Sequence, residues 1–97
     1  MSVPYDTFIG AFLSKISDYD FADMDEDTRT SMTDAFLKRA VAVFRKNCLY
    51  DLTGAADDEE RIFNVDIAPE DVDELVDIIS EGMVVQWLKP FMFQQMI

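Results

Sequence analysis

The chain has no histidine, a single cysteine, and three glycines at positions 10, 54 and 82. The absence of histidine removes the commonest proton shuttle and metal ligand at neutral pH. Because Cys48 is alone, an internal disulfide and a multi-cysteine metal site are excluded, and the chain fits a reducing compartment. The glycines are too far apart to form a phosphate-binding loop. We therefore expect no catalytic residue, no cofactor, no metal and no enzymatic activity.

Positive charge is also scarce, since eight Lys and Arg residues stand against twenty Asp and Glu residues, for a formal net charge of −12. Such a chain is a poor ligand for DNA or an anionic membrane, because phosphate affinity depends on Lys and Arg. No stretch reaches the roughly 20 apolar residues that a membrane span needs. The first residues show no secretory signal. The composition favours a basic protein partner and, as the weaker alternative, imitation of nucleic acid.

Apolar side chains, by contrast, are plentiful, and they include eight Phe, three Tyr and one Trp. A chain of 97 residues forms one domain, and no repeat or linker divides it. We expect a single helical domain over residues 1–97, with residues 90–97 as a C-terminal arm. Because the arm is short, the sequence is also compatible with a longer full-length protein in which the arm continues.

Apolar spacings of three and four residues predict three main helices. The first covers residues 4–16, and the second begins between residues 25 and 31 and ends at residues 47–49. The third covers residues 69–89, where Pro90 stops or kinks it. Pro4 and Pro69 suit first helical positions. Gly10 and Gly82 indicate close helix crossings, and Gly54 indicates a left-handed turn.

Between the second and third helices, residues 55–60 are small and acidic, which predicts an exposed loop. Residues 61–67 then alternate, with Phe63, Val65 and Ile67 on one side, which predicts a short strand or an extended segment. The expected fold class is all-α: a small bundle of three main helices plus an extended loop or short β segment and the arm. The second helix should bury one stripe, with Cys48 as a small hydrophobe in it: Met32, Phe36, Leu37, Ala40, Val41, Phe44 and Cys48.

Two patterns that resemble functional sites fail on inspection. Asp23, Asp25 and Asp27 alternate as in a calcium-binding EF-hand, but Thr28 and Asp34 occupy the places of its Gly and Glu. The abundant carboxylates lie on polar faces, where they ionise normally and do not suit general acid catalysis. A Met- and Phe-lined ligand groove near the carboxyl end stays open as an alternative, although a subunit interface fits the same residues better.

The carboxyl end is too apolar for a small monomer to cover. After Lys89 the chain carries no charge, and large uncovered apolar surface marks a partner interface. The candidate interface residues are Val84, Trp87, Leu88, Phe91, Met92, Phe93, Met96 and Ile97.

The order of elements resembles that of the head–tail connector, or adaptor, proteins of tailed bacteriophages. A short amino-terminal helix precedes a longer one that ends in the Thr53-Gly54 turn. An acidic helix opened by Pro69 then reaches Trp87 near its end. Residues 81–90, Glu-Gly-Met-Val-Val-Gln-Trp-Leu-Lys-Pro, are similar to phage structural proteins.

The resemblance implies a structural virion protein that forms a homo-oligomeric ring, dodecameric to match the portal protein above it. A tail protein or second neck protein would bind below, and DNA would pass through the acidic channel without specific binding. Residues 90–97 would contact the portal or the next subunit, and residues 55–64 would form a variable loop. The expected location is the head–tail interface of the virion, after assembly in the host bacterial cytoplasm, without a membrane partner. The alternative function is a small acidic DNA mimic that inhibits a host DNA-binding enzyme.

Overall fold

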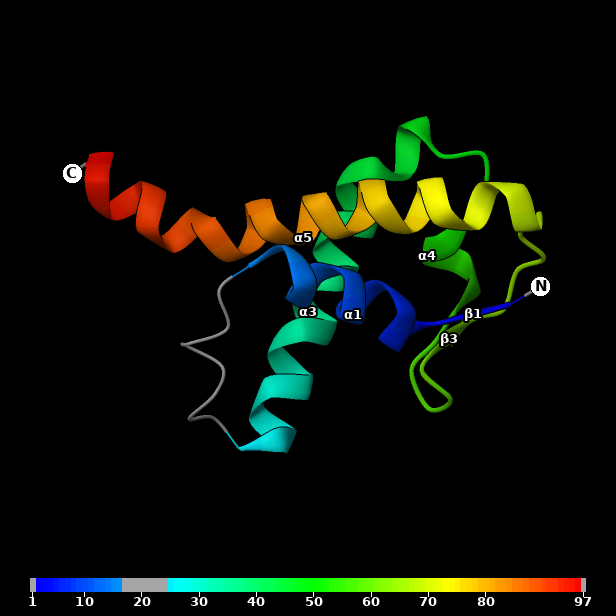
Figure 1. Cartoon of the computed structure of the whole chain (residues 1–97), viewed down its shortest axis with the longest axis horizontal. Helices are drawn as coiled ribbons and strands as arrows, with labels where there is room; N and C mark the ends of the chain where they lie inside the picture. The colour runs from blue at the N-terminus through cyan, green and yellow to red at the C-terminus, as the bar shows by residue number, and fades with distance from the viewer. Residues whose placement is uncertain (1, 17–24, 97) are drawn as a thin grey trace.

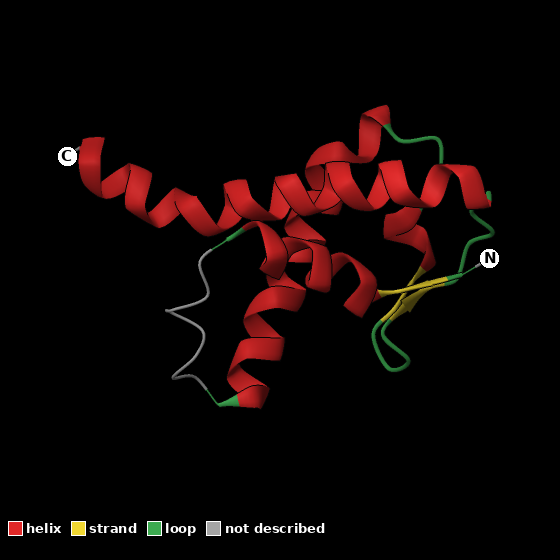
Figure 2. Ribbon diagram, in the orientation of Figure 1, coloured by secondary structure: helices red, strands yellow, loops and turns green. Residues whose placement is uncertain are grey.

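The structure of the protein is a computed structural model that describes residues 2–16 and 25–96, with only the backbone for residues 90–96. Within these residues, three long helices, one short helix and a small sheet confirm the predicted fold class (Figures 1 and 2). The elements in chain order are β1 (Val3–Pro4), α1 (Tyr5–Lys15), α3 (Glu26–Phe44), the 3-10 helix η1 (Arg45–Asn47), α4 (Leu52–Ala55), β2 (Ala56–Asp57), β3 (Ile62–Phe63) and α5 (Pro69–Met96).

Helix α5 lies across both α1 and α3, and the core lies between the three helices (Figure 1). The crossing with α3 is close because Gly82 has no side chain. A Cβ atom at Gly82 would lie 3.2 Å from the Cβ atom of Ala40. The predicted close approach at Gly82 is therefore confirmed. Leu75, Ile79 and Met83 point into the core on the same side of α5.

The other two glycine predictions are wrong. Gly10 is exposed, and a Cβ atom there would have no described atom within 4 Å, so no helix crosses at this point. Gly54 does not adopt a left-handed conformation, because it lies inside the short helix α4. Its N–H donates to Oδ1 of Asp51, at 2.9 Å, and this carboxylate caps α4. This cap stabilises a helical turn at the place where the sequence predicted a left-handed turn.

The buried stripe of α3 follows the predicted period. Phe36, Leu37, Ala40 and Val41 are buried, and the remaining stripe residues pack against them as half-buried side chains. Thr33 is buried as well, which the apolar pattern did not predict. Its hydroxyl donates to the carbonyl oxygens one turn earlier in α3, so burial leaves it hydrogen-bonded.

A small antiparallel sheet ties the amino terminus to residues 56–63. Its strand order is β1-β3-β2, and Phe63 lies opposite both Val3 and Ala56. The predicted alternation after residue 61 is confirmed, because Phe63 and Ile67 are buried. The ring of Phe63 lies 4.8 Å from the ring of Tyr5, centroid to centroid. The participation of residues 3–4 in a strand was not predicted, and it places the start of α1 one residue later than expected.

Arg61 connects three elements at the turn that precedes β3. Its guanidinium donates to both carboxylate oxygens of Asp34 in α3, at 3.0 and 2.6 Å, and to Asp6 in α1, at 2.9 Å. Its carbonyl oxygen accepts the N–H of Tyr5 at 2.8 Å. Arg61 also has a φ of 55°, in the left-handed region that costs most residues about 1–2 kcal/mol. The bidentate pair with Asp34 offsets this strain.

The predicted end of the third helix near residue 88 is wrong, because α5 continues through Pro90 to Met96. Proline removes one backbone hydrogen bond, but its fixed φ of about −65° is compatible with a helix. At about 1.5 Å per residue, the 28 residues of α5 span about 42 Å. The last turns of α5 extend past α1 and α3 (Figure 1). Residues 90–96 therefore continue the helix of α5.

The two helical glycines should respond in opposite ways to substitution. Gly10→Ala should stabilise the protein by about 0.5–1 kcal/mol, because Gly in an exposed helix lowers stability and nothing described obstructs the new methyl group. Gly82→Val should destabilise it by about 2 kcal/mol, because the added methyl groups collide with Ala40. Urea unfolding monitored by circular dichroism measures both, and a stabilising Gly82→Val would contradict the close crossing.

The strain at Arg61 can be separated from its ion pairs by two substitutions. Arg61→Ala and Arg61→Gly both remove the contacts to Asp34 and Asp6, so both should be destabilising. The alanine variant should be the less stable of the two by about 1 kcal/mol, because only glycine adopts a φ of 55° without cost. Equal free energies of unfolding for the two variants would show that residue 61 is not strained.

Candidate protein-binding surface

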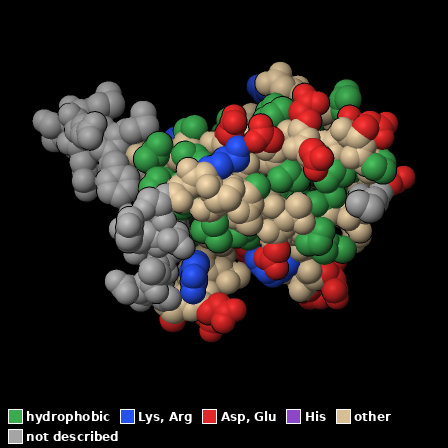
Figure 3. Space-filling view, in the orientation of Figure 1, with side chains coloured by type: hydrophobic (Ala, Val, Ile, Leu, Met, Phe, Trp, Pro, Cys, Tyr) green, Lys and Arg blue, Asp and Glu red, His purple; other side chains and the backbone are tan. Residues whose placement is uncertain are grey.

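The exposed side of α5 changes from acidic to apolar along its length. Over the first three turns most of the exposed residues are acids, alongside Pro69 and Ile78. After Gly82 the exposed positions among the described side chains are Val85, at 52% exposure, Leu88, at 37%, and Lys89. Figure 3 shows acidic and apolar side chains adjoining on one face. The acids on this side of α5 are Glu70, Asp73, Glu74, Asp77 and Glu81.

A groove runs between α5 and the α3–η1 segment, and we name it the α3–α5 groove. It consists of two adjoining hollows of about 230 and 150 Å³ that share Phe44, Asn47 and Ile78. Its floor lies at the close crossing, between Ala40 and Gly82. The residues that line it without being buried are Val43, Phe44, Asn47, Cys48, Leu49, Tyr50, Asp71, Glu74, Ile78, Gly82 and Val85.

Two of the most exposed apolar residues at this groove were absent from the predicted interface. Leu49, after η1, is 94% exposed, and Val43 in α3 is 71% exposed. Both lie outside the apolar stripe of α3. Because an apolar residue outside the buried stripe is expected to be exposed, this position in the sequence could have identified them. Their exposure places the apolar surface partly on α3 and η1, and not on the carboxyl end of α5 alone.

The predicted interface residues fall into three groups. Val84 and Trp87 are half-buried and pack against the core, so much of each side chain is covered within one subunit. Leu88 is exposed as expected. The other predicted side chains lie outside the described residues: Phe91, Met92, Phe93, Met96 and Ile97.

A third hollow of about 300 Å³ lies beside Asp58 and is bounded by Lys38, Leu52 and Phe63. Asp58 accepts the hydroxyl of Tyr5 at 2.7 Å and the ammonium of Lys38 at 2.6 Å. The hydrogen bond from Lys38 makes the largest contribution, and together with that from Tyr5 it lowers the pKa of Asp58. Burial and the same carboxylate raise the pKa of Tyr5 above its ordinary value of 10.0. Asp58 therefore stays ionised, and its oxygens are already occupied, so this cluster ties α1, α3 and the turn together.

The segment that resembled an EF-hand is a helix start. The carboxylate of Asp25 accepts the N–H of Thr28 at 2.9 Å, and this cap lowers the pKa of Asp25. Asp23, in the predicted calcium pattern, lies outside the described residues. Within the described ranges, residues 2–16 and 25–96, no group of three or more Asp, Glu or Cys side chains is arranged to hold a metal ion. In the same ranges, no helix is long and apolar enough to cross a membrane.

Comparison with known proteins found no matching family model, no matching curated protein and no matching solved structure. The candidate surface therefore rests on the geometry above: a groove lined mainly by apolar residues, and the exposed Leu88 on the following turn of α5.

The link between Tyr5 and Asp58 predicts a pH-dependent contribution to stability. At pH 8, Tyr5→Phe should lower the free energy of unfolding by about 1 kcal/mol, because it removes a hydrogen bond to a carboxylate. The folded state holds the Tyr5 proton more tightly than the unfolded state, so this contribution is full below pH 10 and decreases as the pH rises above 10. Urea unfolding of both proteins at pH 8 and pH 11 should show the difference shrinking. A constant difference would contradict the raised pKa.

Proposed function

We propose that this protein is a structural assembly protein of the bacteriophage neck, which forms a ring between the portal and the tail and extends the DNA channel. The resemblance in element order supports the family. The observation that carries the proposal is the carboxyl half of α5, where Val85 and Leu88 are exposed and the helix extends beyond the body (Figure 1).

Apolar side chains exposed on a helix favour a protein partner, because water-exposed apolar surface is costly at about 25 cal/mol per Å². Leu88 is exposed in the subunit, and after Lys89 the sequence up to Ile97 contains no charged residue. In a ring, each such helix end would contact the next subunit or the portal protein. A heterologous contact between identical copies closes into a ring when the rotation allows it.

The high negative charge is consistent with a channel that conducts DNA without binding it, because phosphates and carboxylates repel each other. The alternative, a DNA mimic, receives less support from the geometry. Several acids are neutralised within the subunit by ion pairs, and the acids of α5 give way to apolar residues after Gly82. The paired acids are Asp6, Asp34, Asp58, Asp77 and Glu81.

The test of this proposal is a charge placed on the exposed end of α5. Leu88→Asp should weaken binding to purified portal rings by about tenfold or more, since a buried leucine contributes about 1.5–3 kcal/mol. Native mass spectrometry and negative-stain electron microscopy of the protein mixed with portal rings would measure the occupancy.

The matched control is Ser31→Asp, which adds the same charge at an exposed position in the amino-terminal half of α3. It should leave portal binding unchanged, and circular dichroism should show both variants folded. A wild-type protein that ignores portal rings, or a Leu88→Asp variant that binds them as well as the control does, would contradict the proposal.

A further inference from the structure

Half of the positive charge of the chain is concentrated in one short stretch of α3 and η1. Lys38, Arg39, Arg45 and Lys46 are four of the eight cations, and residues 35–50 include no acid. All four side chains are exposed. Arg39, Arg45 and Lys46 have no ion pair with any described residue. On a chain whose net charge is −12, an exposed basic surface of this kind fits an acidic partner.

These cations lie on the side of α3 that points away from the core. Because α3 buries Ala40 and Val41, the helical period places Ala42 on the outward side, where it is exposed. The cations flank Ala42 as two pairs, residues 38–39 and residues 45–46. The two pairs are seven residues apart, which is about 10 Å along a helix. We name this surface, the two pairs and Ala42, the basic α3 face.

The outward side of α5 carries acids at the same interval. Glu70, Glu74, Asp77 and Glu81 are all exposed and lie opposite the buried side of this helix. Asp77 and Glu81 keep side-chain exposures of 62% and 65%, although both contact Lys15. The first and third acids are seven residues apart, as are the second and fourth, and no Lys or Arg interrupts the series. We name these four acids the acidic α5 face.

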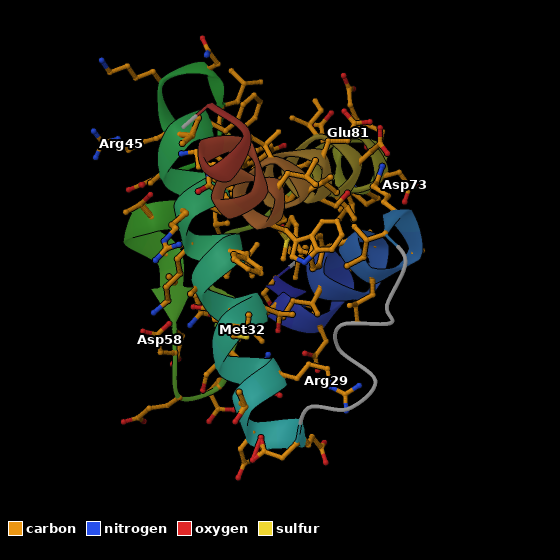
Figure 4. All side chains as sticks on the ribbon, turned by 90° about the vertical axis from the view of Figure 1, so that its left-hand side faces the viewer. Arg29, Met32, Arg45, Asp58, Asp73 and Glu81 are labelled. Carbon is orange, nitrogen blue, oxygen red and sulfur yellow. The ribbon has the colours of Figure 1, made fainter. Side chains whose placement is uncertain are left out.

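The two faces cannot meet within one subunit. Helices α3 and α5 pack against each other through their buried sides, so their outward sides point in different directions. Figure 4 shows Arg45 and Glu81 on different sides of the molecule. The two faces can therefore meet only between subunits. Such a heterologous contact leaves one face of each kind free at the ends of a pair, so it continues to further copies or closes into a ring.

We propose that the basic α3 face of one copy binds the acidic α5 face of a second copy, head to tail. The acidic α5 face supplies what the basic α3 face requires, which is a set of acids on one helix at a seven-residue interval. It is also left exposed by the described part of the chain. The contact specifies the subunit interface of the ring, so it rests on the proposed function. It leaves the carboxyl end of α5 free to contact the portal.

Two charge-reversed variants test the contact by sedimentation velocity and native mass spectrometry of the purified full chain without portal. The wild-type protein should form species larger than a dimer as its concentration rises. Arg39→Glu/Lys46→Glu and Glu74→Lys/Glu81→Lys should each weaken self-association about tenfold or more, because attractive pairs become repulsive. Circular dichroism should show both variants folded, since all four side chains are exposed.

The second variant separates a specific contact from general repulsion. Glu74→Lys/Glu81→Lys moves the formal net charge from −12 to −8, so reduced repulsion alone would strengthen association. The matched control is Glu59→Lys/Glu60→Lys, which gives the same net charge by changing exposed acids in the turn before β3. The control should associate at least as strongly as the wild type. A control that is weakened as much as Glu74→Lys/Glu81→Lys overturns the proposal.

Combining the two charge-reversed variants in one chain exchanges the signs of the two faces. This charge-swapped variant has the wild-type net charge of −12. It should self-associate again, because each face once more meets the opposite charge on the next copy. A charge-swapped variant that associates as weakly as the two variants it combines overturns the proposal.

The behaviour of the wild-type protein decides the remaining outcomes. The proposal is overturned if this protein stays monomeric up to about millimolar concentration, where even weak contacts populate, or if assembly stops at a dimer. A monomeric wild type that binds duplex DNA, with binding lost in Arg39→Glu/Lys46→Glu, would assign the basic α3 face to nucleic acid instead. Assembly through the two faces by a protein that ignores portal rings would support this contact and contradict the neck function. Portal binding by a monomeric wild type would do the reverse.

Discussion

The close crossing of α5 over α3 is the contact on which the rest of the structure depends. Because Gly82 lacks a side chain, α5 approaches the backbone of α3 at Ala40. This distance lets Ile79 and Met83 fill the space between the helices, and α1 closes the core from the other side. It also forms the floor of the α3–α5 groove. Because α1 and α3 both pack on the core side of α5, no element in the described part of the chain covers the opposite side of α5.

The net charge of −12 acts in two separate ways. Part of it is used inside the subunit, where Arg61, Lys38 and Lys15 join the amino-terminal helix, α3, the hairpin turn and α5 through ion pairs. The exposed pairs contribute little each, while the bidentate contact of Arg61 with Asp34 has the geometry that makes an ion pair effective. The remaining acids are exposed at the start of α3, in the turn before β3 and on α5, where like charges repel each other and favour solubility.

Sequence reasoning succeeded where a signal is local. The stripe of α3 follows the 3.6-residue period, so its burial could be predicted. Sequence reasoning failed where one sequence pattern is compatible with several different structures. Gly10 and Gly82 are equivalent in the sequence, yet only Gly82 meets another helix. The pairing of Val3 with Phe63 joins residues 60 positions apart over a two-residue strand, which leaves no periodic signal. Pro90 predicted a helix end, but its backbone angles also fit a continuing helix.

By itself, the sequence determined that the chain forms one helical domain, that its charge is strongly negative, and that its carboxyl end carries more apolar residues than a small body can cover. These properties follow from composition and helical periodicity, which need no knowledge of neighbours. Only the tertiary structure decided which apolar residues stay exposed. Val43 and Leu49 became part of a groove because α5 lies beside α3 and η1, and no local pattern specifies that relation.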